Sequence, residues 1–569
     1  MSETLSRTCQ NCKIDFTIES DDFVFYEKMK VPPPTFCPKC RLVRRMNNTN
    51  ERVLYTRRCD FTGKTIFSMF PADTPFPVYN VDDWYGDGWD PYQYGMEYDF
   101  SRPFFEQFLE LQNKVPRMAL VRQGKSINSE YSHRVDNPKN SYMVFRATQP
   151  EECAYLYVGM YVRECFDCAY VTKCELCYEC IDCENSYRLV HCQESINCRD
   201  SNFLYSCFNC SNCTGCVNLR NAEFCIENVQ YTKEEYYEKL KTLNLHTRSG
   251  LDAYEIHFDE FRKKQPQRAT TSLKVDHVSG NWMTNCQNVQ NSFGCFNVKD
   301  AKHLFVVFDA QDCMDYFQWG NKAELVYESE NCGIQVSKLF SCSQCWMGAH
   351  DLEYCDSCPG ASYSFGCIGV KKGEYCILNK KYDKDTYFEI VEKIKKQMDE
   401  KPFVGQNGRV YKYGEHFPLE VSPFAYNETA AQDFFPLTKQ DALSKGYTWK
   451  DKQKNIYNPT MKATDLPETI QEVSDDIKSQ IIECLEKEKD YSVGAYKITE
   501  QELLFYRKMN LPLPQVCFNV RFVRRFMKRP PMDLIERSCS KCSAKTFTVY
   551  TASYAPILYC EDCYRSSFV

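Results

Sequence analysis

Residues 153–183 read CAYLYVGMYVRECFDCAYVTKCELCYECIDC, and their cysteines are spaced with unusual regularity. Fourteen of the 35 cysteines of the chain lie between Cys153 and Cys225, and each gap between neighbours is a multiple of three. Thiols placed for chemistry rarely keep one period over such a length, whereas side chains that face inward on a regularly coiling backbone do. The period therefore predicts a repeat array in which most of these thiols pack in the interior.

A recurring phrase predicts the shape of the repeat. A polar residue, then Ser or Cys, a spacer and an aromatic or apolar run appear as NSYMVF from residue 140, DCAYV from 167 and NSYRLV from 185. The polar pair suits a turn and the run suits a short strand. Short strands at steps of about 12 to 18 residues, stacked coil on coil, form a β-solenoid.

The two ends of the chain repeat each other at an offset of 480 residues. Residues 23–45 (FVFYEKMKVPPPTFCPKCRLVRR) align without gaps to 503–525 (LLFYRKMNLPLPQVCFNVRFVRR), with 11 of 23 positions identical. The same offset places Cys59 on Cys539 and Tyr79 on Tyr559. Each end is therefore predicted to be a tandem of two small modules.

A second duplication lies inside the array. Residues 215–238 match 366–389 with 10 of 24 positions identical, so each half is predicted to end in a helix. The first helix starts at Thr232, with Glu235 completing a capping box, and the second near Asp383. Further helices are expected near 103–114, with Ser101 as candidate cap, and over 467–487.

These patterns predict a mainly β protein with α+β zinc modules. Its centre is a Cys-rich β-solenoid in two duplicated halves, flanked at both termini by duplicated treble-clef or zinc-ribbon modules. The expected divisions are 1–115 (N-terminal tandem module and helix), 116–245 and 246–400 (solenoid halves), 401–480 (aromatic-rich connection) and 481–569 (C-terminal tandem module).

Composition narrows the class of protein. The formal charge is −7, so the whole chain is not a polycation that coats nucleic acid. It has no run of about 18 apolar residues, and its first residues lack an apolar signal core. We therefore expect a cytoplasmic protein with reduced thiols, in which CxxC pairs are candidates for metal.

Two pairs of CxxC knuckles predict structural zinc. One pair encloses 24 residues and the other 17, and both spacings are typical of tetrahedral sites with four thiolates. Four thiolates leave no position for a substrate, so no catalysis is expected at either site. The predicted ligands are Cys9, Cys12, Cys37 and Cys40 at one end, and Cys539, Cys542, Cys560 and Cys563 at the other.

The other two modules have lost ligands. At the offset of 480, Ser492 and Val520 replace Cys12 and Cys40, and Cys517 is left alone. In the second module of the N-terminal tandem, Cys59 is left alone in the same way. Each end is thus expected to keep one metallated and one degenerate module.

The array thiols leave alternatives open. A third zinc site is a candidate at Cys342, Cys345, Cys355 and Cys358. The runs Cys174–Cys183 and Cys207–Cys216, with a cysteine at every third residue, resemble ferredoxin spacing but lack its longer last spacer and proline, so an iron–sulfur cluster is a weaker alternative. A buried ladder of small apolar thiols is the simplest interpretation.

Two basic stretches beside the zinc modules suggest contacts with nucleic-acid phosphates. The alternative is a solvated helix face beside acidic neighbours, which the net charge favours. The candidate contacts are Arg41, Arg44, Arg45, Arg521, Arg524, Arg525, Lys528 and Arg529. No Gly-rich phosphate loop, nucleophile elbow or paired histidine ligands are present, so no catalytic residues are predicted.

Several phrases resemble a family of large Cys-rich, zinc-ribbon-ended proteins predicted in uncultivated bacterial lineages. They are DFSRPFFEQF, GCVNLRNAEFC, SPFAYNETAAQDFFPLTKQDALSKGYTW and the two aligned end segments. The resemblance implies this architecture and zinc, and implies no reaction. From the basic stretches beside the zinc modules and from the extended solenoid, we expect a non-enzymatic scaffold whose end modules pair with each other and whose partner is RNA, a ribonucleoprotein or a protein. A redox or metal-handling protein that uses the array thiols, with iron–sulfur clusters or several zinc ions, is the alternative.

Overall fold

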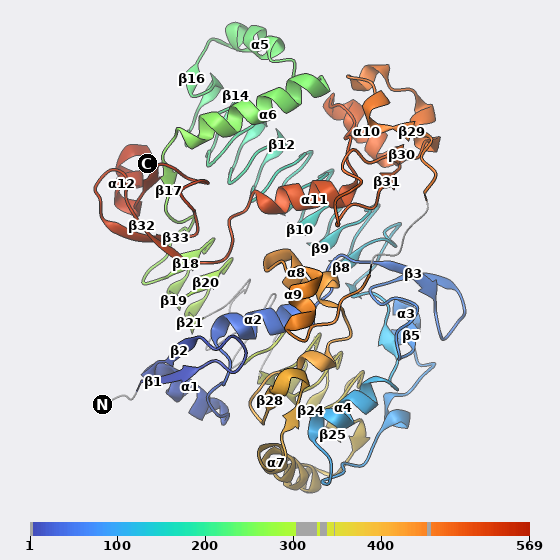
Figure 1. Ribbon diagram of the computed structural model, residues 1–569. Helices are drawn as coiled ribbons and strands as arrows, with labels where there is room; N and C mark the ends of the chain where they lie inside the picture. The colour runs from blue at the N-terminus through green and yellow to red at the C-terminus, as the bar shows by residue number, and fades with distance from the viewer. Residues whose placement is uncertain (1–3, 303–326, 331–337, 346–347, 452–456, 569) are drawn as a thin grey trace.

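Short strands outnumber helices among the described residues, and helices lie at the top, at the bottom and across the middle of the view in Figure 1. The computed structural model describes residues 4–302, 327–330, 338–345, 348–451 and 457–568. The protein is therefore mainly β, with several helices and a four-cysteine group near each terminus.

The first half of the array is a stack of parallel strands in which each coil spans twelve positions of the chain. Tyr157 pairs with Phe145 on one side and with Ala169 on the other. Isolated bridges repeat this step between the strands, as from Glu175 to Tyr187. The strands are β7 (Arg122–Gln123), β8 (His133–Asp136), β9 (Phe145–Thr148), β10 (Tyr157–Met160), β11 (Ala169–Thr172), β12 (Tyr187–Val190), β13 (Arg199–Asn202), β14 (Ser211–Thr214), β15 (Glu223–Ile226) and the antiparallel edge β16 (Val229–Gln230).

The backbone turns at every third residue of these coils. Tyr155, Val158 and Tyr161 have φ values of 55°, 57° and 55°, in the left-handed region that side chains other than glycine rarely adopt. Neighbouring coils hold this conformation, because the N–H groups at these positions donate to carbonyls one coil back, as from Tyr155 to Tyr142 at 3.1 Å. Asn and Asp, which tolerate this region best, occupy many of the turns.

The residue after each turn points into the stack. All fourteen cysteines between Cys153 and Cys225 are buried, in agreement with the inward orientation that their period predicts. Their thiols satisfy backbone carbonyls, as Cys165 does with Cys174 at 3.4 Å. Ser186 takes an equivalent inward position, and its hydroxyl donates to the carbonyl of Glu184 at 2.8 Å. A small side chain with a hydrogen donor therefore suits both the narrow interior and its carbonyls.

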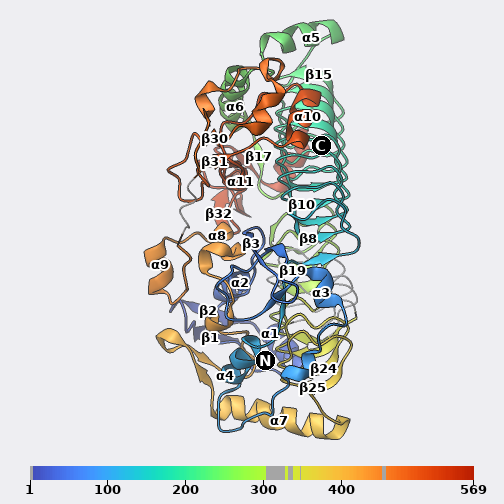
Figure 2. The same ribbon diagram turned by 90° about the vertical axis from the view of Figure 1, so that its right-hand side faces the viewer.

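The second half is built in the same way. Gln287 pairs with Lys299, again twelve positions along the chain, whereas Leu339 pairs with Leu352, thirteen positions along. Figure 2 shows both stacks along one side of the molecule, with the terminal modules beside them. The strands are β18 (Gly280–Asn281), β19 (Gln287–Gln290), β20 (Ser292–Phe293), β21 (Lys299–Lys302), β22 (Leu339–Phe340), β23 (His350–Glu353), β24 (Ser362–Phe365), β25 (Glu374–Ile377) and the antiparallel edge β26 (Lys380–Lys381).

A helix follows the last strand of each stack, as predicted. α5 (Lys233–Thr242) starts after Thr232 with a capping box completed by Glu235. α7 (Lys384–Glu400) starts after Asp383, whose side chain accepts a hydrogen bond from the N–H of Thr386. α5 is followed by α6 (Arg248–Lys263), which packs Tyr254 and Phe258 against Phe203 of the first stack. The two helices α5 and α7 lie at opposite ends of the molecule (Figure 2).

Two helix predictions are wrong in part. α4 (Phe104–Gln112) lies where a helix was expected, but Pro103 is its N-cap, and Asp99 binds the N–H of Ser101 instead. No continuous helix spans 467–487, which the structure describes throughout. The 3-10 helices Ile470–Glu472 and Asp475–Ser479 are followed by β30 (Ile482–Glu483), which pairs with β29 (Met461–Lys462) and β31 (Ala495–Tyr496). Strand pairing thus overrides the helical pattern there.

Where the structure describes the connecting region 401–480, it contains only short elements. They are β27 (Phe403–Val404), β28 (Val410–Tyr411), α8 (Ala430–Phe434) and α9 (Lys439–Ser444), together with further 3-10 turns. The N–H of Ala430 donates to the carbonyl of Thr49, so this region packs against the N-terminal module.

Each terminal tandem contacts both stacks. β5 (Val78–Tyr79) pairs with β6 (Arg117–Met118), just before the first stack. β34 (Leu558–Tyr559), its counterpart at the offset of 480, pairs with β17 (Gln267–Arg268), just before the second stack. The helices of the tandems are arranged the other way round. α2 (Pro38–Asn47) of the N-terminal tandem contacts the second stack, and α11 (Phe518–Met527) of the C-terminal tandem contacts the first.

Contacts between the two tandems are also present. The guanidinium of Arg52 lies 4.3 Å from the ring centroid of Phe522, and Lys39 pairs with Asp533 at 2.9 Å on the surface.

Candidate metal centres

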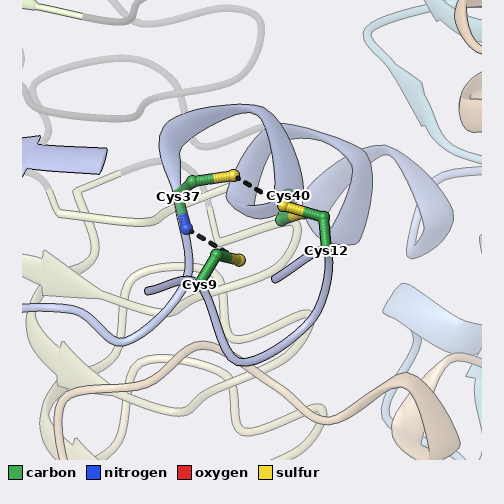
Figure 3. A group of neighbouring side chains, drawn as sticks. All are labelled: Cys9, Cys12, Cys37 and Cys40. Carbon is green, nitrogen blue, oxygen red and sulfur yellow. Dashed lines mark hydrogen bonds between the residues drawn. The ribbon is translucent and has the colours of Figure 1, made fainter. Parts of the chain in front are cut away.

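The N-terminal centre forms where a hairpin meets a helix. β1 (Leu5–Thr8) and β2 (Asp15–Ile18) flank the tight turn that carries Cys9 and Cys12. Cys37 is the N-cap of α2 and Cys40 lies in its first turn. Figure 3 shows the four side chains converging from these two segments.

The geometry of this centre suits one metal ion. Its four sulfur atoms lie within 4.8 Å of one another, and the Sγ atoms of Cys12 and Cys37 are 3.7 Å apart. The N–H of Cys37 donates to Sγ of Cys9 at 3.2 Å, and the amide of Asn11 donates to Sγ of Cys40 at 3.2 Å. Hydrogen bonds from Cys37 and Cys40 lower the pKa of Cys9. N–H donors aimed at sulfur stabilise thiolates, the form that binds metal.

The C-terminal centre repeats this arrangement. β32 (Ile535–Ser538) and β33 (Lys545–Thr548) flank the turn with Cys539 and Cys542, and Cys560 and Cys563 lie at the start of α12 (Glu561–Phe568). Its four sulfur atoms also lie within 4.8 Å of one another. The N–H of Cys560 donates to Sγ of Cys539 at 3.3 Å. Burial opposes ionisation there, but the N–H groups of Cys560 and Cys542 lower the pKa of Cys539 to about 6.

These two groups are the candidate metal sites of the described residues. Each could hold a metal ion, and all cysteines of the described part are free thiols rather than disulfides. Each donor set consists of thiols alone, held by backbone N–H groups, which suits a tetrahedral ion such as zinc.

The degenerate modules keep the outline of the same site. In the C-terminal tandem, the N–H of Cys517 donates to Sγ of Cys484 at 3.2 Å, and Ser492 Oγ lies 3.6 Å from Cys517 Sγ. Val520 is buried in the same cluster. Cys517 is therefore not alone, contrary to the gapless alignment, because an insertion between Cys484 and Ser492 hides the correspondence of Cys484 with Cys9.

The second module of the N-terminal tandem shows the same loss. The N–H of Asn80 donates to Sγ of Cys59 at 3.3 Å, as Cys560 does to Cys539. Asp83 Oδ2 lies 3.8 Å from that sulfur. One thiol and one carboxylate thus stand where the C-terminal module has four thiols.

The candidate third site lies in the interior of the second stack. Cys342, Cys345, Cys355 and Cys358 are buried, and their thiols donate to backbone carbonyls, as Cys342 does to Leu352 at 3.4 Å. They are not among the groups of the described residues whose ligand atoms all lie within 4.8 Å of one another. They pack together in the interior of the second stack, and a third zinc site at these cysteines stays a prediction.

Most of the basic residues singled out in the sequence are inside the protein. Arg41, Arg44 and Arg45 are at most 3% exposed and surround Glu328 of the second stack. Arg44 also reaches Glu415 at 3.2 Å. These three charges are thus used in a buried network.

The C-terminal basic stretch has the same role against the first stack. Arg521 and Arg525 bind Asp167 at 3.0 and 2.8 Å, and Arg529 binds Asp182 at 2.9 Å. Lys528 pairs with Glu255 at 2.7 Å, and only Arg524, paired with Glu486, is more than half exposed at its side chain. Nucleic-acid contacts at these positions stay a prediction. The acidic partners were missed because no local spacing links them to the arginines.

No protein-family model matches this chain, and no curated protein matches it. Among the described residues, no helix is both long and apolar enough to span a lipid bilayer.

Proposed function

We propose that this protein is a non-enzymatic scaffold, held together by two structural zinc ions and offering one face of a β-solenoid to a partner. The observation that carries the proposal is the way in which the terminal modules contact the stacks. Each four-thiol site positions a segment that contacts a stack, and four thiolates leave no open coordination position for a substrate. On this proposal the modules resemble treble clefs or zinc ribbons in fold and act as braces.

The solvent face of the first stack supports a role in binding. Arg163, Glu175, Tyr187 and Arg199 follow one another at the same position of successive coils, and we call them the outer ladder. Tyr187 is 45% exposed, and Tyr161, at the turn before Arg163, is 55% exposed. Aromatic side chains on a regular strand face are suited to a protein interface.

The charges of this face favour a protein over a nucleic acid. Arg163 and Glu175 alternate in the outer ladder, and Arg188 lies 3.8 Å from Asp200 beside it. Phosphates require an excess of positive charge, whereas alternating charges suit a protein partner with complementary charges. The arginines that would have supplied a positive patch are buried against Glu328 and Asp167.

The test places a photoreactive amino acid at Tyr187 in the protein expressed in its source cells. We expect repeated cross-linking of one protein, identified by mass spectrometry, and its loss when Arg188 is changed to Glu. The matched control carries the same amino acid at Phe388, which is 43% exposed on α7. Cross-links to RNA would replace the protein partner with RNA, and the same cross-links from both positions would overturn the proposal.

Elemental analysis tests the metal part separately. We expect about two zinc ions per chain, both lost when the eight cysteines of the two centres are changed to serine. Iron in place of zinc in the native chain would contradict the zinc assignment. Zinc that the eight-cysteine variant retains would also contradict it.

A metal-handling role is the second candidate, because the first stack contains coils whose inward positions are all cysteines. In this role the inward thiols would hold either iron–sulfur clusters or several further zinc ions.

A further inference from the structure

The interior of the first stack holds two dense groups of thiols. Inward positions recur every third residue, and one coil spans twelve positions of the chain. Cys174, Cys177, Cys180 and Cys183 therefore occupy all four inward positions of one coil, and all are at most 1% exposed. Cys207, Cys210, Cys213 and Cys216 do the same in a later coil.

We call each of these groups of four inward cysteines a ring, and cysteines of adjacent coils extend both rings. Cys213 is paired in register with Cys225, and neighbouring strands lie about 4.8 Å apart, so thiols at the same position stack directly above one another. We call the first group, with its neighbours, cluster A, and the second cluster B. Cluster A is Cys165, Cys168, Cys174, Cys177, Cys180, Cys183 and Cys192, and cluster B is Cys198, Cys207, Cys210, Cys213, Cys216 and Cys225.

The thiols of each cluster lie in register between adjacent coils. The pairing of Phe166 with Tyr178 places Cys165 at the same position as Cys177 in the next coil, and the pairing of Ala169 with Ile181 does the same for Cys168 and Cys180. In cluster B, the pairing of Arg199 with Ser211 places Cys198 at the same position as Cys210. Each cluster is thus a dense group of sulfur atoms inside a narrow shaft.

This arrangement suits an ion that takes few ligands. Among the described residues, only the two terminal centres bring three or more ligand atoms within 4.8 Å of one another, so neither cluster offers a ready tetrahedron of sulfur atoms. Zinc prefers four ligands in a tetrahedron, whereas Cu(I) is a soft cation that accepts two or three thiolates.

Charge balance also favours a monovalent ion. A thiol that binds Cu(I) forms a Cu–S bond and loses its proton to solvent, so one positive charge replaces another. When thiolates bridge neighbouring ions, the ratio of ions to thiolates approaches one and the interior stays neutral. A divalent ion held by four thiolates would instead leave two negative charges in an apolar shaft, where uncompensated charge is costly.

We propose that clusters A and B of the first stack form a polynuclear Cu(I) site, built from thiols stacked in the interior of the coils. The proposal does not depend on the scaffold function or on zinc at the terminal centres. A packing role alone would not require these cysteines to bind any metal, whereas the proposal assigns Cu(I) to them.

The chain itself offers a conservative substitution for the test. Ser186, Ser195 and Ser201 occupy inward positions in coils between the rings, and their hydroxyls donate to the same kind of carbonyl as the thiols. Cys→Ser changes in the clusters therefore keep the backbone hydrogen bonds while removing the soft ligand.

Protein that holds its zinc is mixed without oxygen with Cu(I), supplied as its acetonitrile complex, and then challenged with the chelator bicinchoninate, whose Cu(I) complex is coloured. We expect the native chain to retain several Cu(I) ions with its zinc content unchanged. The variant Cys177→Ser/Cys180→Ser is expected to retain at least about two fewer ions, and Cys210→Ser/Cys213→Ser to show a similar loss in cluster B.

The matched control is Cys286→Ser in the second stack. Cys286 is buried like the cluster thiols, but the register of β19 and β21 places Val298 at its position in the next coil. Copper retention equal in this control and in the native chain supports the proposal. The proposal is overturned if the native chain retains no Cu(I), both as purified and after refolding with Cu(I), if both cluster variants retain as much as the control, or if copper is retained only by displacing zinc.

Discussion

The guanidinium of Arg525 and the carboxylate of Asp167 are joined by a 2.8 Å hydrogen bond across a separation of 358 residues. Both side chains are at most 2% exposed. Arg44 and Glu328 form the equivalent contact at the other end, also at 2.8 Å. Asp167 and Glu328 both occupy left-handed turns of their coils, with φ values of 51° and 45°. α11 and α2 therefore each bind, through a buried arginine, a turn of a stack that is distant from the helix in sequence.

The first prediction concerns this buried pair. Asp167→Asn removes the carboxylate that Arg521 and Arg525 share and leaves them only Glu502 and Glu179 as acidic partners. Breaking a buried ion pair costs about 3–5 kcal/mol. We expect a decrease of that size in the free energy of unfolding, measured with urea. The control is Glu389→Gln, because Glu389 pairs with Lys393 on the exposed face of α7. Equal effects of the two changes would contradict the buried network.

The second prediction concerns pH. Glu194 accepts hydrogen bonds from Tyr205 at 3.2 Å and from Tyr550 of the C-terminal module at 3.1 Å. Burial raises the pKa of Glu194 from its usual 4.5 to about 7. The carboxyl group of Glu194 therefore holds its proton more tightly in the folded state than in the unfolded state. The contribution of protonated Glu194 to stability is full below pH 4.5 and is lost as pH rises to about 7.

Glu194→Gln removes this dependence. We expect the variant to gain stability relative to the native chain as pH rises from 5 to 8, seen in the midpoint of urea unfolding. The control is Glu175→Gln on the outer ladder. A constant difference between Glu194→Gln and the native chain over this range would show that Glu194 is ionised throughout.

The third prediction restores a lost metal centre. Ser492→Cys together with Val520→Cys completes four thiols with Cys484 and Cys517, whose 3.2 Å contact between N–H and sulfur is the same as that of Cys37 with Cys9 in the N-terminal centre. We expect bound zinc to rise by about one ion per chain in elemental analysis. The single change Val520→Cys supplies only three thiols and serves as control. An unchanged zinc content in the double variant would show that the insertion after Cys484 has altered the site.

The fourth prediction links metal to the second stack. Cys9→Ser together with Cys37→Ser removes half of the N-terminal ligands and releases the start of α2, which carries Arg44 to Glu328. We expect faster hydrogen exchange in residues 339–377 than in residues 145–226, because α2 contacts the second stack. The corresponding change, Cys539→Ser with Cys560→Ser, is the comparison. Uniform acceleration in both stacks would indicate global destabilisation rather than a local brace.

Much of the local structure could be predicted from sequence. The cysteine period predicted inward thiols, and Thr232 and Asp383 marked the starts of α5 and α7. The CxxC knuckles predicted the two four-cysteine groups. All of these depend on residues within one coil, one turn or one hairpin, where side-chain direction and capping are set by neighbours in the chain.

Tertiary structure alone determined which distant segments meet. Nothing near Arg525 in sequence indicates Asp167, and the same arginines were equally consistent with a surface for phosphates. The partnership of Cys484 with Cys517 was hidden by an insertion, and Ile482 entered a three-stranded sheet although its segment has a helical pattern. A buried charge must meet an opposite charge, but which one it meets depends on how the stacks and the modules pack around it.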